Sequence, residues 1–396
     1  MMSKLQNKAI SAPNSPEIDY SIKDLSNILT PALAIYAANV EHNIETTISL
    51  LDNEPGRWRP HVKTSKLAYV MRMLAVRGVT AVKCATTLEM LTACEAGARD
   101  ILLAYPAVGP TANRAAEIAL AHPNTTFSVL VDSPLQVAQW SGTRVGVFLD
   151  IDPGMHRTGV PQEEIDEIAN LARKTLQLGI AFRGLHYYDG HLTDANIDER
   201  TRQAHAGYNH LLKIVASLRS HGIQVEEVIT AGTPAFPCSL SYRAFNAAPF
   251  KHTVSPGTIV YGDLTSQASL PPDFGYRLAA LVLSRVISSS QPEHFTCDAG
   301  HKTVSVDSGV PNCSVLGWEG LVPLRPSEEH LPVSVVPGSR VPEIGEVLYL
   351  APRHVCPTVN NFSHALIVKD REIVGVENVS ARGREAPVWI PAQPQP

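Results

Sequence analysis

Residues 82–105 read VKCATTLEMLTACEAGARDILLAY, and this stretch decides the fold. Short apolar runs stand at its two ends, and between them residues 88–98 carry apolar side chains at the spacing of one helix face. A strand, an amphipathic helix and a second strand in that order make one β-α-β unit, whose strands run parallel. The stretch therefore predicts a parallel sheet covered by helices.

The alternation of strand and helix continues in both directions. Helical patterns separate further apolar runs at residues 32–37, 126–131, 144–151, 182–189 and 225–232. Before residue 265 the chain has room for about seven or eight such units, the number that a closed barrel needs. We therefore expect an α/β fold, with a TIM-type (β/α)8 barrel over residues 21–270. The first apolar run, residues 32–37, also fits the domain that follows.

The pattern changes after Pro271. Runs such as RLAALVLSRVISSS at residues 277–290 are strand-like and bounded by Gly, Pro and Ser, with no long helical stretch between them. We place a domain boundary at 265–275 and expect a β-rich domain over residues 271–385. Residues 1–20 are polar and the segment 386–396 is rich in proline, so we expect a disordered extension and a flexible tail.

Composition excludes several classes of protein. The chain has 396 residues, of which 44% are hydrophobic and 18% charged, as in a globular protein. A net charge of -5 without a basic run argues against nucleic acid as a partner. No window of about 18 apolar residues and no apolar signal region are found, so we expect a soluble, cytoplasmic protein without a membrane partner. The six cysteines have no CxxC spacing, which favours reduced thiols.

Two segments at predicted strand ends carry reactive or charged groups. Arg59–Lys66, RPHVKTSK, precedes a predicted helix, and partial desolvation of Lys63 there would free its amine as a nucleophile. A solvated loop lysine fits the same spacing. In Asp150–Gly159, DIDPGMHRTG, the guanidinium of Arg157 can stabilise a phenolate where a lysine would itself react, although an ordinary salt bridge is the alternative.

Two later segments suit a phosphate group. Thr230–Pro234, TAGTP, and Ser255–Gly262, SPGTIVYG, follow predicted strands late in the barrel, where phosphate sites are usual. Each segment alone is also a common kind of turn. The candidate ligands are Gly232, Thr233, Gly257, Thr258 and Tyr261.

Gly184–His191, GLHYYDGH, concentrates titratable and aromatic groups after another predicted strand. Alternation along the strand puts His186 and Tyr188 on one face and Tyr187 and Asp189 on the other. A core histidine with hydrogen-bonded tyrosines is the alternative interpretation.

His354 and Cys356 form an H-x-C pair in the C-terminal domain. On an extended strand, residues two apart point to the same side, so both can bind one ion. An imidazole and a thiolate favour zinc over harder ions. A packed pair of side chains is the alternative.

Taken together, these segments closely resemble those of fold-type III pyridoxal-phosphate (PLP) enzymes, in the D-threonine aldolase and D-serine dehydratase branch of the alanine racemase superfamily. The resemblance covers about residues 28–385. It implies that Lys63 forms the Schiff base with PLP and that Arg157 lies near the phenolate oxygen. It also implies that the two glycine-containing segments hold the phosphate.

The resemblance extends to the rest of the site. It implies that His186 lies beside the pyridine ring and that Tyr188 also binds the cofactor. Asp189 and His191 stand where the aldolases have further catalytic or metal-proximal groups, so both are candidate catalytic residues beside Lys63. The H-x-C position holds a divalent metal in this family, so His354 and Cys356 are expected to bind Zn²⁺ or Mn²⁺.

The family implies a lyase that acts on D-3-hydroxy amino acids, in a homodimer. We favour retro-aldol cleavage to glycine and an aldehyde, with dehydration to a 2-oxo acid and ammonia as the alternative. The H-x-C pair resembles the dehydratases, whereas the following Pro357–Asn360 resembles the aldolases. A racemase or a non-catalytic PLP-binding protein is less favoured.

Overall fold

The computed structural model describes residues 18–291 and 293–387. These residues divide into two compact units. The first unit holds residues 18–43 and 261–377, and the second holds residues 44–260 and 378–387. The predicted combination of an α/β domain and a β-rich domain is confirmed, because the second unit is α/β and the first is β-rich.

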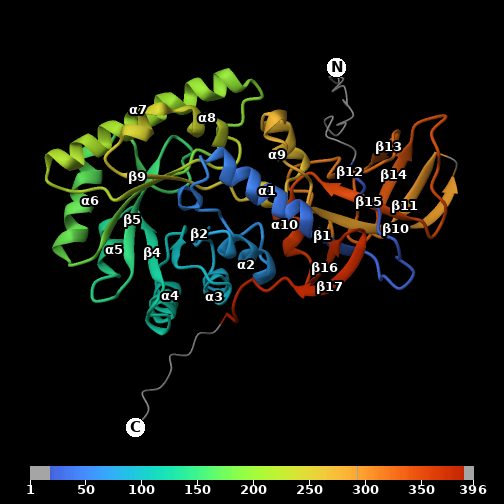
Figure 1. Cartoon of the computed structure of the whole chain (residues 1–396), viewed down its shortest axis with the longest axis horizontal. Helices are drawn as coiled ribbons and strands as arrows, with labels where there is room; N and C mark the ends of the chain where they lie inside the picture. Colours follow the sequence, from blue (N-terminus) through green and yellow to red (C-terminus); the bar gives the residue numbers. More distant parts are fainter. Residues whose placement is uncertain (1–17, 292, 388–396) are drawn as a thin grey trace, which may run out of the picture. The chain divides into compact units, whose positions relative to one another are not determined.

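A parallel sheet in the order β2-β3-β4-β5-β7-β8-β9 forms the centre of the second unit (Figure 1). Its strands are β2 (Ala81–Cys84), β3 (Asp100–Leu103), β4 (Thr126–Val131), β5 (Gly146–Asp152), β7 (Phe182–Tyr187), β8 (Glu227–Thr230) and β9 (Lys251–Val254). A short strand, β6 (Val160–Pro161), pairs with β5. The helices are α2 (Ala68–Val76), α3 (Thr87–Glu95), α4 (Pro110–Ala121), α5 (Pro134–Ala138), α6 (Ile165–Gln177), α7 (Ile197–Ser220) and α8 (Phe236–Ser241).

Over the described residues the sheet has seven regular parallel strands besides the two-residue β6, where the expected (β/α)8 barrel has eight. Residues 58–62 bridge β9 and β2 instead: Trp58 makes a single bridge with Val254, and His61 makes one with Lys83. The N–H of Val62 donates to the carbonyl of Lys83 at 2.8 Å. Because Pro60 has no N–H to donate, this segment cannot continue as a regular strand.

Successive residues of each strand point to opposite faces of the sheet. One face carries an apolar layer of Leu102, Leu130, Phe148 and Ile229. Their neighbours along the chain, such as Val147, belong to the larger core that the sheet forms with its helices. The layer on the inner face therefore separates the two ends of the barrel-like sheet.

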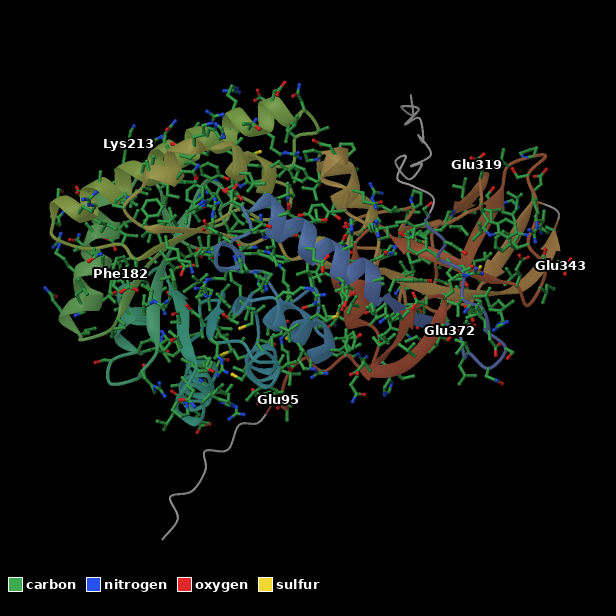
Figure 2. All side chains as sticks on the ribbon, in the orientation of Figure 1. Glu95, Phe182, Lys213, Glu319, Glu343 and Glu372 are labelled. Atoms are coloured by element: carbon green, nitrogen blue, oxygen red, sulfur yellow. The ribbon has the colours of Figure 1, made fainter. Side chains whose placement is uncertain are left out.

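Helix α7 illustrates why the covering helices form. The side chain of Asn196 caps the first turn by accepting hydrogen bonds from the N–H groups of Asp198 and Glu199. The negative charges of these two residues also interact favourably with the positive end of the helix dipole. Tyr208 and Leu211 on one face are fully buried. On the other face Lys213 points away from the sheet (Figure 2).

A buried ion cluster ties segment 58–62 to the sheet. The side chain of Arg59 is 0% exposed, and its guanidinium donates to both carboxylate oxygens of Glu227 on β8 at 3.0 and 2.8 Å. It also donates to Asp100 on β3 at 3.0 and 2.9 Å. Burial and the charge of Arg59 act in opposite directions on the pKa of Asp100, and the net effect is to lower it.

The first unit is built on a sheet in the order β13-β14-β11-β10-β1-β16-β17, with β12 and β15 attached at β10. Its strands are β1 (Ala32–Tyr36), β10 (Ala280–Gln291), β11 (His294–Cys297), β12 (Cys313–Val315), β13 (Leu321–Pro323), β14 (Leu331–Val335), β15 (Val347–Pro352), β16 (His364–Lys369) and β17 (Glu372–Asn378). β1 pairs antiparallel with β10 and parallel with β16. The apolar run 32–37 therefore joins the β-rich unit.

The ends of the units differ from the ranges drawn from the sequence. The division falls after Asn43, within helix α1 (Ala37–Leu50), and again between Val260 and Tyr261. Residues 1–17 and 388–396 of the predicted extension and tail lie outside the described residues. Within the predicted extension, Tyr20 stacks edge-on against Tyr36 at 5.2 Å between ring centroids. None of the described helices is long and apolar enough to cross a bilayer.

The Arg59 cluster yields a prediction about stability. Replacing Arg59 by Met leaves Glu227 and Asp100 without their main partner, so we expect the protein to lose about 3–5 kcal/mol of unfolding free energy. Denaturant unfolding at pH 7 measures the loss. Lys23→Met is the control, because it removes an ion pair whose side chains are 55% and 61% exposed and should leave the midpoint unchanged. Equal midpoints for the two variants would contradict the role given to Arg59.

Candidate active site

The candidate residues of the second unit stand where its parallel strands end. Lys63 follows segment 58–62, Arg157 follows β5, and His186 lies at the end of β7. The TAGTP and SPGT segments follow β8 and β9. Because parallel strands end at one edge of a sheet, the fold gathers these residues at the edge where barrel enzymes bind substrates.

The ring of Tyr188 is the point where several of these residues meet. The guanidinium carbon of Arg157 lies 4.8 Å from the ring centroid, and Nζ of Lys83 lies 5.6 Å from it. A Cβ atom on Gly232 would come within 2.8 Å of the ring. Among the described residues Arg157 has no carboxylate partner, so its charge is open to a ligand. Arg157 and Tyr188 line a small open pocket together with Asp150 and Thr158.

The loop after β8 contains a buried polar group of interest. Oγ1 of Thr233 is buried and has no hydrogen-bond partner among the described residues. The preceding Ala231 has φ +56°, an unfavourable conformation for a residue with a side chain. The N–H of Gly232 donates to Oδ1 of Asp189 at 3.2 Å, which holds the loop in place. A buried hydroxyl without a hydrogen-bond partner lowers the stability of the protein unless a ligand forms a hydrogen bond with it.

The loop after β9 lies next to it. Ser255 N–H donates to the carbonyl of Thr230 at 3.0 Å, so the two predicted phosphate segments start side by side. Gly257 is packed against the backbone of His61 so closely that a Cβ atom would overlap the His61 carbonyl oxygen. Thr258 begins a 3-10 turn and is half-buried. Tyr261 is fully buried and belongs to the first unit.

The loop that carries Lys63 is tied down from within. Lys63 is half-buried in a turn, and its N–H donates to Nδ1 of His61 at 3.3 Å. Lys66 has φ +52° and is buried, with its ammonium donating to Glu89 at 2.9 Å and to the carbonyl of Ala381 at 3.2 Å. The N–H of Ala381 donates in turn to the Lys66 carbonyl. The returning end of the chain therefore fastens the Lys63 loop.

His186 lies in a buried polar cluster. Its Nδ1 is 2.7 Å from Oδ1 of Asp150, and its Nε2 is 2.9 Å from Nζ of Lys83. Burial, reinforced by the charge of Lys83, lowers the pKa of His186 to about 4, so the ring is neutral at pH 7. Since the Asp150 carboxylate only accepts, Nδ1 carries the proton and Nε2 accepts from Lys83.

Asp189 and His191 differ in their surroundings. Asp189 is 0% exposed, and its Oδ2 accepts from the hydroxyl of Tyr208 at 2.6 Å. Burial outweighs this bond and the one from Gly232, so the pKa of Asp189 is raised. His191 is exposed in the loop after β7. Asp189 thus anchors a neighbouring loop, whereas His191 is accessible.

The metal candidates belong to the first unit, and one expectation about them is wrong. His354 and Cys356 do not lie on a strand, because β15 ends at Pro352 and helix α10 (Val355–Asn360) begins directly after His354. Their side chains nevertheless form a hydrogen bond. Nδ1 of His354 lies 2.6 Å from Oδ2 of Asp307. Burial lowers the pKa of His354, but Cys356 and Asp307 together raise it to about 9.

The imidazole of His354 and the thiol of Cys356 are ligands that a soft divalent metal prefers, but they supply only two ligands. Asp307 occupies Nδ1 of His354, which leaves Nε2 as the ligating atom, as in many carboxylate–histidine–metal arrangements. No cluster of three or more His, Cys, Asp or Glu side chains with metal-binding geometry occurs within the part of the chain that the structure describes. Two protein ligands would leave open positions for water or substrate.

The structure thus brings together most of the predicted residues of the second unit, around Tyr188 and at the two adjacent loops. Sequence reasoning gives no role to Lys83, Ser255 or Asp150. Lys83 could have been found from the sequence, because it is the one charged residue in AVKC, the fully buried run that forms β2. Asp307 is likewise found only from its contact with His354.

Two family models match the chain. The model described as "Alanine racemase, N-terminal domain" matches residues 35–265, and the one described as "Putative serine dehydratase domain" matches residues 279–368. The first match covers more than half of the chain, and the second contains the H-x-C pair.

Several relatives match nearly the whole chain, among them three that are named as aldolases. The D-threonine aldolase of Arthrobacter sp. is 29% identical over 91% of this chain and 94% of its own length. The 3-hydroxy-D-aspartate aldolase of Paracoccus denitrificans is 28% identical over 93% of this chain and 97% of its own. The crystal structure of D-threonine aldolase from Filomicrobium marinum superposes with a TM-score of 0.83 at 26% identity, covering 91% of this chain and 98% of that one.

The clamp on the Lys63 loop yields a prediction. Lys66→Met leaves Glu89 buried without its ion-pair partner and removes a bond to Ala381, so we expect faster deuterium uptake in residues 62–67 and 379–382. Hydrogen exchange followed by mass spectrometry measures it. The control is Lys213→Met, an exposed lysine on α7 whose loss should leave both segments unchanged. Unaltered uptake in the Lys66 variant would show that the loop is held by other contacts.

Proposed function

Since the chain belongs to the alanine racemase family, we propose that it is a PLP-dependent lyase that cleaves D-3-hydroxy amino acids between Cα and Cβ. The observation that carries this proposal is the buried, unpartnered hydroxyl of Thr233 between adjoining loops at the carboxyl ends of β8 and β9. Such a position suits a phosphate oxygen. Three relatives that match nearly the whole chain are named as aldolases of this substrate class, and a relative that matches 84% of the chain is named as a dehydratase of the same class.

The residues present fit PLP. We assign the Schiff base to Lys63, which lies at the sheet edge on a loop held by Lys66. Arg157 would bind the phenolate oxygen, because its guanidinium is exposed and has no carboxylate partner among the described residues. The ring would lie against His186 and Tyr188. The phosphate would be held by residues of the two adjoining loops, Gly232, Thr233, Gly257, Thr258 and Tyr261.

When bound to the substrate amine, PLP withdraws electrons from Cα and so weakens the bonds at that carbon. Retro-aldol cleavage then needs a base that takes the proton of the β-hydroxyl, so that the Cα–Cβ electron pair moves toward Cα and an aldehyde leaves. A proton returned to Cα, from the protonated base or from water, then gives glycine. The exposure of His191 supports it as this base. The burial of Asp189 and its bonds to Tyr208 and Gly232 support a positioning role for that carboxylate.

We further propose that His354 and Cys356 hold a divalent metal. Such an ion would act as a Lewis acid that lowers the pKa of a hydroxyl group bound to it. The bond between Asp307 and Nδ1 of His354 supports this assignment, because it orients the imidazole and raises its basicity as a ligand. A homodimer and a cytoplasmic location stay predictions.

Dehydration is the second candidate reaction. Cys356 supports it, since the H-x-C pair resembles the dehydratase side of the family, and the region that holds it matches the serine dehydratase model. In that reaction Lys63 would take the Cα proton and the β-hydroxyl would leave. Hydrolysis of the product then gives a 2-oxo acid and ammonia.

One incubation separates the two reactions. Metal-loaded holoenzyme is given D-threonine, D-serine and 3-hydroxy-D-aspartate separately, and glycine, aldehyde, 2-oxo acid and ammonia are all measured. We expect glycine in equal amounts with acetaldehyde from D-threonine or with glyoxylate from 3-hydroxy-D-aspartate. Ammonia with 2-oxo acid instead would establish the dehydratase. Absence of all four products with every substrate would refute the lyase.

Lys63→Ala serves as the inactive variant in that incubation, and borohydride reduction of the holoenzyme tests the Schiff base directly. We expect mass spectrometry to find the reduced adduct on Lys63 in the natural chain and on no residue in the variant. Lys251→Ala, at the amino end of β9, is the matched control and should keep the adduct. An adduct on another lysine would refute the assignment.

Metal removal gives a separate prediction. Chelation should abolish turnover while the absorbance of bound PLP stays largely intact, because the Schiff base does not need the ion, and Zn²⁺, Mn²⁺ or Co²⁺ should restore the rate. Cys356→Asp keeps a negative ligand but makes it harder, so the preference should move toward Mn²⁺. Cys94→Ser, which changes a half-buried thiol of the second unit, should keep the original preference. A metal-free preparation that turns over at the original rate would exclude the metal role.

A further inference from the structure

Lys83 is the one charged side chain of β2, and it points to the inner face of the sheet. Its neighbours Val82 and Cys84 belong to the core under the helices, and Lys83 pairs in register with Leu102 of the inner apolar layer. Only 2% of Lys83 is exposed. A lysine in this position places its ammonium inside the sheet, near the edge where the candidate site lies.

Among the described residues the ammonium has two hydrogen-bond partners, and neither is a carboxylate. Nζ lies 2.9 Å from Nε2 of His186 and 2.8 Å from Oγ of Ser255. Ser255 donates its own proton to the carbonyls of Thr230 and Ala231, so its oxygen accepts from Lys83. Lys83 therefore links β2 to β7 and to the start of the SPGT segment. A buried ammonium without a carboxylate partner is unfavourable for stability, and such groups cluster at functional sites.

The charges around Lys83 are mostly of its own sign. Burial is the largest influence on its pKa, followed by the charge of Lys63, and together they lower the pKa to about 7, against the opposing effect of Asp150. Arg157 and Arg59 act in the same direction as Lys63. The charged and titratable groups that face Lys83 from the surrounding strands and loops are Lys63, His61, Asp150, His186, Arg157, Arg59 and the ring of Tyr188.

We propose that Lys83 is a positioning residue of the cofactor site, which fixes the orientation and tautomer of His186 and carries a positive charge into the site. The proposal rests on the proposed function for the identity of the cofactor. Asp150 holds Nδ1 of His186 and Lys83 holds Nε2, so the imidazole plane is clamped from both nitrogens. A ring fixed in this way presents one constant face to whatever lies against it.

The proposal has a consequence for bound PLP. Because the absorbance of the cofactor depends on the charge around it, loss of the Lys83 proton should change that absorbance. Below the pKa of Lys83 the side chain is charged, and above that pKa it is neutral. Burial lowers this pKa, so the holoenzyme should show a low-pH and a high-pH spectrum that interconvert below the ordinary pKa of a lysine.

Two substitutions separate these forms. In Lys83→Met the charge is absent at every pH, so the holoenzyme should keep the high-pH spectrum from pH 5.5 to 8.5. In Lys83→Arg the charge is permanent, so it should keep the low-pH spectrum over the same range. Lys251→Met, an exposed lysine at the other end of β9, should show the original transition. A transition that persists in both Lys83 variants would overturn the proposal.

A measurement on the cofactor-free full chain does not depend on the proposed function. Imidazole ¹⁵N NMR should find His186 neutral with the proton on Nδ1 at pH 6, and Lys83→Met should raise its pKa from about 4 toward the ordinary value of about 6.5. The sign follows because a neighbouring positive charge disfavours the protonated ring. A proton on Nε2 in the natural chain would overturn the proposal even if neither variant folds.

The borohydride adduct and the NMR measurement distinguish failure of the proposed function from failure of the role proposed for Lys83. If the preparation forms no reducible adduct on Lys63, the proposed function fails, while the NMR result still decides the contact between Lys83 and His186. If the adduct forms on Lys63 but His186 carries its proton on Nε2, the proposed function stands and the role of Lys83 is wrong.

Discussion

The buried guanidinium of Arg59 binds carboxylates on two strands that are far apart in the chain, Asp100 on β3 and Glu227 on β8. This interaction holds segment 58–62, which Pro60 prevents from pairing as a regular strand. Removing either side would leave a buried charge uncompensated, so the segment has one stable position. Lys63 follows four residues after Arg59, and the placement of its loop depends on that anchor.

Inside the sheet, the side chains form layers whose chemistry differs from one end to the other. The charged cluster of Arg59 occupies one layer, an apolar layer with Phe148 and Ile229 follows, and Asp150, His186 and Lys83 lie beyond it. The apolar layer keeps the two polar layers apart, so each satisfies its own hydrogen bonds. Three of the loops at the candidate site contain a residue with positive φ, namely Lys66, His156 and Ala231. Strain of this kind persists only where surrounding contacts enforce it.

The two units offer different ligand chemistry. The second unit presents an amine, a guanidinium, hydroxyls and backbone N–H groups, which suit an anionic cofactor with an aldehyde. The first unit presents an imidazole held by Asp307 and a thiol beside it, which suit a soft cation. In the proposed function, the second unit would therefore bind PLP and the first unit would bind the metal ion.

The sequence by itself determined the β-α-β pattern, the change to a β-rich domain, and the candidates Lys63, Arg157 and Gly232, because periodicity and short motifs are local properties of a chain. It could not determine which sheet the run 32–37 joins, that segment 58–62 replaces an eighth strand, or that His354 precedes a helix. The tertiary structure also decided the partners of Lys83, since His186 and Ser255 lie 103 and 172 residues away from it along the chain. Contacts of that kind depend on strand register and on the alternation of faces in three different strands, which no local pattern encodes.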